Sequence, residues 1–231
     1  MSSSPTPSIF LKVSAISHIE FCPKRSKIEN FHKSQPTGAG ILEIIRKGIK
    51  LHWQYSFPFK NFDRVLIRSK LKSKSTNKYH IFEKVLDGYI VVRGKYDDLR
   101  VIRCNGKKYV SLIEVKTTSK KYMWNREIKS AIRQLELYMW MLKEYLDNMG
   151  FPLWERSYVE IYSQKNGQLM KRIPVVYNDK IEDWIRAVVG VYYGLVKMNV
   201  PPFSYCKLCP ISIKKKCDWY ILRRSLKCVQ L

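Results

Sequence analysis

The sequence has 231 residues, which suits one large domain or one domain with a small appendage. Hydrophobic residues make up 45% of it and aromatic residues 13%, enough for a real core, which argues against wholesale disorder. Lys and Arg number 43 against 19 Asp and Glu, so the formal net charge is +24. A domain this basic repels itself unless it meets a polyanion: nucleic acid first, an anionic membrane surface second, with a merely basic soluble protein as the alternative.

Membrane insertion and secretion are not expected from this sequence. No stretch approaches the apolar length of a membrane span, and residues 1–10 lack the basic and apolar regions of a secretory signal. We therefore expect a cytoplasmic protein, where thiols stay reduced. The six cysteines should then serve as ligands or core residues rather than in disulfides.

The first half of the chain predicts two helices and then several strands. Residues 1–12, rich in Ser and Pro, look frayed, and Ser14 could cap a helix running to about Phe31. Apolar spacing over 38–55 predicts an amphipathic helix. Strands are predicted at 65–71, 79–86, 89–102 and 109–116, the last two joined by a turn at Cys104–Lys108.

The second half predicts two long helices around a β-hairpin. The helical spacing of apolar residues favours a helix over 125–149, which Gly150 ends. Strands are expected at 158–163 and 170–176, and a last helix at 179–200. This order of elements predicts an α/β (α+β) fold with a mixed central sheet flanked by helices.

The turn in the middle of the chain predicts which residues face each other. Asn105-Gly106 between two β-patterned runs is a strong signal for a two-residue hairpin turn. Such a turn sets Asp97 directly opposite Glu114 across the two strands. Lys116, two residues after Glu114, then lies on the same face of the sheet.

Two carboxylates opposite each other indicate a cation site. Like charges facing each other in a sheet are destabilising unless a cation sits between them. With backbone oxygen and water they would form a site of hard oxygen ligands suited to Mg²⁺ or Mn²⁺. The Lys116 ammonium could orient an attacking water or offset charge developing on a phosphate. The alternative is a surface ion pair between Glu114 and Lys116 at a strand end.

Four short motifs in a fixed order resemble a known family. They are GIKLH (Gly48–His52), GKYD (Gly94–Asp97), EVK (Glu114–Lys116) and QLELY (Gln134–Tyr138). This order resembles the RecB-type nucleases of the PD-(D/E)XK superfamily, with its G-x-x-x-H, G-x-x-D, (D/E)-x-K and Q-x-x-x-Y patterns. The resemblance implies a restriction-endonuclease-like fold and a Mg²⁺- or Mn²⁺-dependent deoxyribonuclease.

The resemblance also implies roles for individual residues. His52, Asp97 and Glu114 would be metal ligands, together with the backbone carbonyl of Val115, and Lys116 would be the catalytic lysine. For His52 the alternative is a histidine on a helix surface.

Gln134 and Tyr138 would support the site or the DNA strand. They are one helical turn apart, so they can face the cleft together. The alternative for Tyr138 is an aromatic residue at the edge of the core.

Within this family the chain is most similar to the CRISPR-associated RecB-like iron–sulfur exonucleases, the fourth Cas protein family. Those nucleases hold a cluster with one N-terminal and three C-terminal cysteines. The matching residues here are Cys22 in FCPKR and Cys206, Cys209 and Cys217 in YCKLCPISIKKKC. The gap before Cys217 is longer than the family pattern, which makes Cys228 a substitute.

On spacing alone, four thiolates suit a [4Fe–4S] cluster or Zn²⁺ equally, and the resemblance favours iron. It implies a nuclease domain over 1–202, whose N-terminal helix carries one cluster cysteine, and a cluster-binding tail over 203–231. Cys104 abuts the hairpin turn and is not expected to be a ligand.

Three basic segments, 68–78, 116–126 and 214–224, are candidates for contacting DNA. The last two interleave Tyr and Trp with Lys and Arg, a mixture that suits single-stranded DNA. A solvated loop face is the alternative, above all for 68–78.

The expected function is a metal-dependent exonuclease on single-stranded DNA in CRISPR spacer acquisition, with the integrase complex as a partner. The alternatives are a cluster- or zinc-stabilised nuclease of DNA repair, recombination or a virus, and a DNA-positioning subunit with little activity of its own. Oligomerisation is left open.

Overall fold

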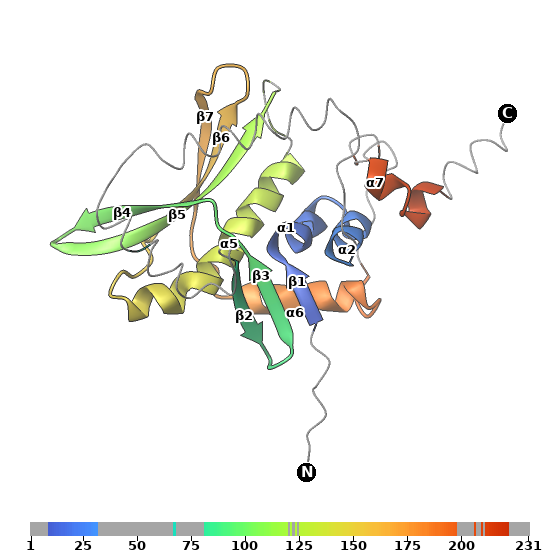
Figure 1. The fold of residues 1–231 in the computed structure, drawn as a ribbon, viewed down its shortest axis with the longest axis horizontal. Helices are drawn as coiled ribbons and strands as arrows, with labels where there is room; N and C mark the ends of the chain where they lie inside the picture. The colour runs from blue at the N-terminus through green and yellow to red at the C-terminus, as the bar shows by residue number, and fades with distance from the viewer. Residues whose placement is uncertain are drawn as a thin grey trace, which may run out of the picture.

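The computed structural model of the chain describes residues 9–31, 67, 81–119, 121, 123, 125–197, 206, 209 and 211–221. In these ranges helices flank β-sheets (Figure 1), so the predicted mixed α/β class is confirmed. The strands divide between two sheets instead of forming the one central sheet that the sequence predicts.

The larger sheet has four strands in the order β4-β5-β6-β7. Strands β5 and β6 run parallel, and the other neighbouring pairs run antiparallel, so this sheet is mixed as predicted. Its strands are β4 (Asp98–Cys104), β5 (Lys107–Thr118), β6 (Ser157–Ser163) and β7 (Leu169–Val175).

The β4–β5 hairpin has the predicted register. Cys104 lies opposite Lys107 and Asp98 lies opposite Ile113. Asn105 and Gly106 have φ angles of 50° and 73°, as a two-residue turn with both central residues left-handed requires. Continuing this register by one position brings Asp97 level with Glu114.

The smaller sheet has the strand order β1-β3-β2, with β1 (Ile9–Lys12), β2 (Phe82–Leu86) and β3 (Ile90–Gly94). The expected single strand over 89–102 is therefore wrong, because the chain leaves β3 at Gly94 and enters the other sheet at Asp98. Ile9–Lys12 are also not frayed, since they pair in parallel with β3 and Leu11 is buried.

The predicted N-terminal helix is divided into three pieces, α1 (Val13–Ile16), the 3₁₀ turn η1 (Ser17–Glu20) and α2 (Pro23–Phe31). Lys12, and not Ser14, is the N-cap of α1, and it makes no side-chain cap bond. Pro23 opens α2, because it has no N–H to continue the preceding helix. Cys22 therefore lies in the break before α2.

The later helices are α5 (Asn125–Asn148), α6 (Ile181–Tyr192) and α7 (Ile211–Lys214). Helix α5 agrees with the prediction, and Gly150, at φ 75°, follows its end. Helix α6 ends well before residue 200. Gly194 at φ 78° turns the chain so that Val196 folds back against Gly190.

Helix α5 is the centre of the molecule, with the four-stranded sheet on one side and α1 and α2 on the other (Figure 1). Its buried residues, which include Leu135 and Trp140, share one apolar core with Leu112 of β5 and Val159 of β6. None of the helices in the described ranges is long and apolar enough to cross a membrane.

Some predicted features fall partly or wholly outside the described residues. The helix over 38–55 and the proposed domain boundary at 202 lie outside the described residues. Of the strand over 65–71, Ile67 alone is described, and it is buried and helical rather than extended.

Candidate active site

Asp97 and Glu114 come together where the chain passes from β3 into β4. The backbone N–H of Val115 donates to the Asp97 carboxylate at 2.8 Å, which holds Asp97 against β5. Glu114 points the other way from Val115, toward α5, and is only 3% exposed. Both carboxylates act electrostatically on Lys116 and Tyr138, so the two negative charges border the same space.

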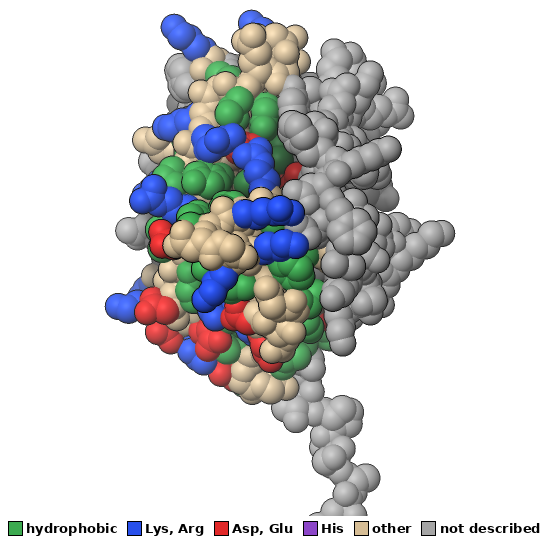
Figure 2. Space-filling view, turned by 90° about the vertical axis from the view of Figure 1, so that its left-hand side faces the viewer, with side chains coloured by type: hydrophobic (Ala, Val, Ile, Leu, Met, Phe, Trp, Pro, Cys, Tyr) green, Lys and Arg blue, Asp and Glu red, His purple; other side chains and the backbone are tan. Residues whose placement is uncertain are grey.

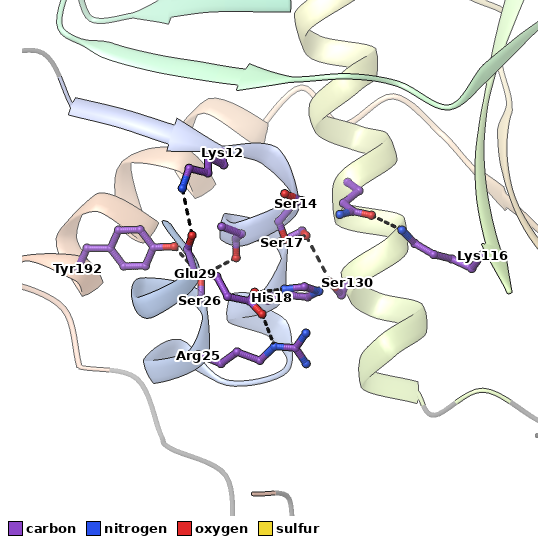
Figure 3. A network of polar contacts seen from close by, with 12 residues as sticks. Lys12, Ser14, Ser17, His18, Arg25, Ser26, Glu29, Lys116, Ser130 and Tyr192 are labelled. Atoms are coloured by element: carbon purple, nitrogen blue, oxygen red, sulfur yellow. Dashed lines mark hydrogen bonds and ion pairs between the residues drawn. The ribbon is translucent and has the colours of Figure 1, made fainter. Parts of the chain in front are cut away.

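Lys116 joins the sheet to helix α5. Its ammonium donates to a carboxylate oxygen of Glu114 and to the side-chain oxygen of Gln134, the latter at 2.5 Å. Figure 3 shows this side chain reaching from β5 toward the helix. Burial by itself would lower the pKa of Lys116, but the charges of Glu114 and Asp97 outweigh burial and raise it. Lys116 is therefore a cation at neutral pH.

Gln134 and Tyr138 lie one turn apart on α5 and are both buried. Gln134 uses its amide oxygen to hold Lys116. The Tyr138 hydroxyl lies at the backbone of Lys95, and its ring packs against Gly94. Burial first, and then the charges of Glu114 and Asp97, raise the pKa of Tyr138 well above its ordinary value, so the phenol stays protonated.

The structure thus brings five of the residues predicted from the sequence into one place. These are Asp97, Glu114, Lys116, Gln134 and Tyr138. Val115 contributes its N–H to the site, whereas the metal-binding role of its carbonyl stays a prediction. His52 lies outside the described residues.

The donor atoms fit a hard divalent cation, although the described residues do not complete a site. Two carboxylates and a backbone carbonyl are the oxygen ligands that Mg²⁺ and Mn²⁺ prefer. Among the described residues, no group of three or more His, Cys, Asp or Glu side chains is arranged to hold a metal. A third side-chain ligand would have to come from elsewhere, and His52 is the predicted one.

A polar network that no sequence motif indicated joins η1 to α2. His18 of η1 contacts Glu29 through Nδ1, and Arg25 donates to the other oxygen of Glu29 at 2.9 Å (Figure 3). Burial, and then the charges of Arg25 and Lys116, lower the pKa of His18 against the opposing effect of Glu29. Arg25 and Glu29 lie one turn apart on α2, but only the packing of η1 against α2 brings His18 to them.

The four predicted cluster cysteines lie in one region, at the start of α2 and in the C-terminal tail. Burial raises the pKa of Cys209 to about 11, with smaller effects of Cys22 and Cys206, and Cys217 acts in the same sense on Cys22. An ion pair of 2.8 Å between Lys24 and Asp218 joins α2 to the tail. Within the described residues, however, these thiols do not form a ligand group.

The two remaining cysteines are Cys104 and Cys228. Cys104 is half-buried beside the hairpin turn, and Cys228 lies outside the described residues. A cluster on Cys22, Cys206, Cys209 and Cys217 therefore stays a prediction.

Two of the three basic segments include described residues. Arg126 donates to the backbone oxygen of Phe21 at 2.9 Å, so it ties α5 to the N-terminal helices. In the tail, the Lys214 ammonium lies 5.6 Å from the ring centre of Tyr220. Segment 68–78 lies outside the described residues.

Two carboxylates and a lysine at one end of paired strands, backed by a helix, are an arrangement that suits metal-assisted hydrolysis. A family model described as the PD-(D/E)XK nuclease superfamily matches residues 45–213 of this sequence, and the chain belongs to that superfamily. Its members typically use divalent metals such as Mg²⁺, and their substrate is DNA.

Two solved structures are similar to this chain over most of its length. The crystal structure of SSO0001 is 17% identical, covers 91% of this chain and 88% of its own, and has a TM-score of 0.48. A candidate exonuclease from Eubacterium rectale is 13% identical, covers 87% and 85%, and has a TM-score of 0.40. A search of curated proteins found no significant match.

Proposed function

We propose that this chain is an exonuclease that hydrolyses single-stranded DNA with Mg²⁺ or Mn²⁺. One observation carries the proposal: a protonated Lys116 stands between Glu114 and Gln134, beside the Asp97 carboxylate. A protein that only binds DNA has no need for this set, because two carboxylates weaken the attraction of a basic surface for phosphate.

The residues would divide the chemistry among them. Asp97, Glu114, the Val115 carbonyl and His52 would hold the metal, which when bound lowers the pKa of water and neutralises charge on the phosphate. The Lys116 ammonium would donate to the scissile phosphate or its attacking water, at a site where a donor is most effective because it is partly shielded from solvent. Gln134 keeps Lys116 in position.

For the biological setting we propose CRISPR spacer acquisition, with the integrase complex as the partner and a [4Fe–4S] cluster on Cys22, Cys206, Cys209 and Cys217. The order of the motifs and the gathering of these cysteines support this setting. Zn²⁺ on the same thiols, in a nuclease of repair, recombination or viral origin, is the alternative, and metal analysis separates the two ions.

The test uses anaerobically purified protein, Mn²⁺ and single-stranded DNA labelled at either end. The wild type should shorten the linear strand from an end and leave circular single strands intact. Lys116→Ala should lose at least about 100-fold in rate, the size of effect expected for a donor aimed at developing charge. Lys107→Ala, at the exposed tip of the β4–β5 hairpin, is the matched control and should cleave like the wild type.

Three other outcomes would contradict parts of the proposal. Binding by wild type and Lys116→Ala without cleavage by either would leave a positioning subunit. Equal cleavage by both would mean a contaminant or an active site elsewhere. Cleavage of circular strands would show an endonuclease.

A further inference from the structure

The β6–β7 hairpin stands directly beside the end of the strand that carries the catalytic residues. Strands β5 and β6 run parallel, with Lys116 opposite Ile161. At the end of this pairing, the Gln164 N–H donates to the carbonyl of Thr118 at 2.9 Å. The turn of the hairpin therefore begins level with the segment that leaves the proposed active site.

The outer strand of this hairpin is open to solvent on both of its faces. The first four residues of β7 are all exposed, and Leu169 and Met170 are 42% and 39% exposed. The pairing of β6 with β7 shifts register here, from Ile161 opposite Lys171 to Tyr162 opposite Leu169, so Leu169 and Met170 depart from the strict alternation of a regular strand. Figure 1 shows the hairpin projecting past the nearby end of α5, so core packing does not explain its length.

The turn of this hairpin and the segment that follows β5 are rich in basic residues. Between Glu160 and Asp179 the sequence has three basic residues and no acidic one, and between Glu114 and Glu127 it has four basic residues and no acidic one. Lys165 and Lys171 are exposed on the hairpin, while Arg172 pairs with Glu160. In Figure 2, Lys and Arg predominate on the upper part of the face and acidic side chains gather on the lower part.

We infer that the β6–β7 hairpin is an arm that holds single-stranded DNA beside the cleavage site. The inference rests on the proposed nuclease function and names a part of the substrate-binding surface for it. Lys165 and Lys171 contact the phosphates, and Leu169 and Met170 contact the faces of unpaired bases. A duplex hides those faces, so the exposed apolar pair selects a single strand.

The first experiment measures binding of labelled oligothymidine by fluorescence anisotropy without divalent metal, so that nothing is cleaved. Leu169→Ser/Met170→Ser should bind about tenfold more weakly than the wild type, the loss expected when one base loses its stacking surface. Its affinity for a blunt duplex should not change. Val85→Ser is the matched control, because Val85 is 55% exposed on β2 in the other sheet.

The second experiment separates phosphate contacts from base contacts. Lys165→Ala/Lys171→Ala should weaken binding of the single strand and the duplex alike. The slope of log affinity against log salt should become shallower by about 0.7 for each lysine. In cleavage assays both double variants should raise KM and keep kcat, whereas Lys116→Ala should lower kcat.

The outcomes distinguish this inference from the function on which it rests. If the wild type cleaves DNA and Leu169→Ser/Met170→Ser binds oligothymidine as tightly as the wild type does, the arm is disproved and the nuclease function stands. If that variant loses the same affinity for the single strand and for the duplex, the contact with unpaired bases is disproved. A wild type that neither binds nor cleaves oligothymidine overturns both proposals. Unchanged circular dichroism and melting would confirm that each exposed substitution leaves the fold intact.

Discussion

Gly94 shows at the scale of one residue why a motif position has to be small. It ends β3, directly before the segment that brings Asp97 to the site. A Cβ at this position would lie 2.7 Å from Cγ2 of Val13 and 2.8 Å from Cε1 of Tyr138. Helices α1 and α5 can therefore pack this closely on the sheet only because Gly94 has no side chain. The same close contact positions Tyr138 in the candidate site.

Gly94→Ala should lower the free energy of unfolding by about 1–3 kcal/mol, because the rigid neighbours have to shift to admit a methyl group. Urea denaturation should show a lower midpoint with an unchanged m-value. Val85→Ala, an exposed residue in the same sheet, should stay within about 0.5 kcal/mol of the wild type. A wild-type midpoint for Gly94→Ala would mean that the helices can move apart freely.

At the scale of elements, two hydrogen bonds from one arginine of α6 hold the turn between β2 and β3. Arg186 donates from Nε and Nη2 to the two carboxylate oxygens of Asp87, at 2.9 and 2.8 Å. Asp87 has a φ of 54°, a left-handed conformation that Asp and Asn tolerate better than most residues. The hydrogen bond from Arg186 lowers the pKa of Asp87 below its ordinary value.

The pH dependence of this contact follows from the direction of that shift. A carboxyl whose pKa is lower in the folded state stabilises the fold above its unfolded pKa of about 3.9, and it loses that contribution as pH falls through the folded pKa. Asp87→Asn keeps the backbone conformation and removes the charge. Its urea midpoint should lie slightly below the wild type at neutral pH and should meet the wild type in strong acid.

Arg186→Gln removes the charge of the other partner in this contact. It should lower the neutral-pH midpoint as Asp87→Asn does, and the double variant should lose little more than either single one. A wild-type advantage over Asp87→Asn that persists in strong acid would show that the carboxylate charge is not the cause.

At the scale of the whole molecule, the C-terminal tail returns to the beginning of the chain. Asp218 pairs with Lys24 of α2, and Tyr192 at the end of α6 lies 2.5 Å from the Ser26 hydroxyl. The proposed cluster would join the same two regions through bonds to cysteine sulfur. Of its ligands, Cys22 and Cys206 are 184 residues apart in the sequence. Holding such distant ends together costs roughly 4–5 kcal/mol of chain entropy.

Removal of the proposed cluster should therefore lower the melting temperature. Cys22→Ala and Cys209→Ala should each lose bound iron or zinc by metal analysis and melt earlier than the wild type. Cys104→Ala, which alters a half-buried thiol beside the hairpin turn, should keep its metal. A ligand variant without metal that melts like the wild type would refute the idea of a structural clasp.

Local features of the sequence were enough to predict much of this protein. The period of apolar residues determines α5, and the φ preferences of Asn105 and Gly106 determine the β4–β5 register. That register alone predicts that Asp97, Glu114 and Lys116 lie together in one site. These predictions succeed because side-chain periodicity and turn geometry depend on residues close together in the chain.

The tertiary structure decided what depends on partners distant in sequence. Strand β1 exists because β3 offers it an edge, and the β-rich run over 89–102 is divided because its two parts pair in different sheets. Gln134 meets Lys116 only after α5 packs on β5, and His18 meets Glu29 only after η1 packs on α2. No pattern within a short segment encodes such contacts, since they form only when packing brings distant segments within a few ångströms of one another.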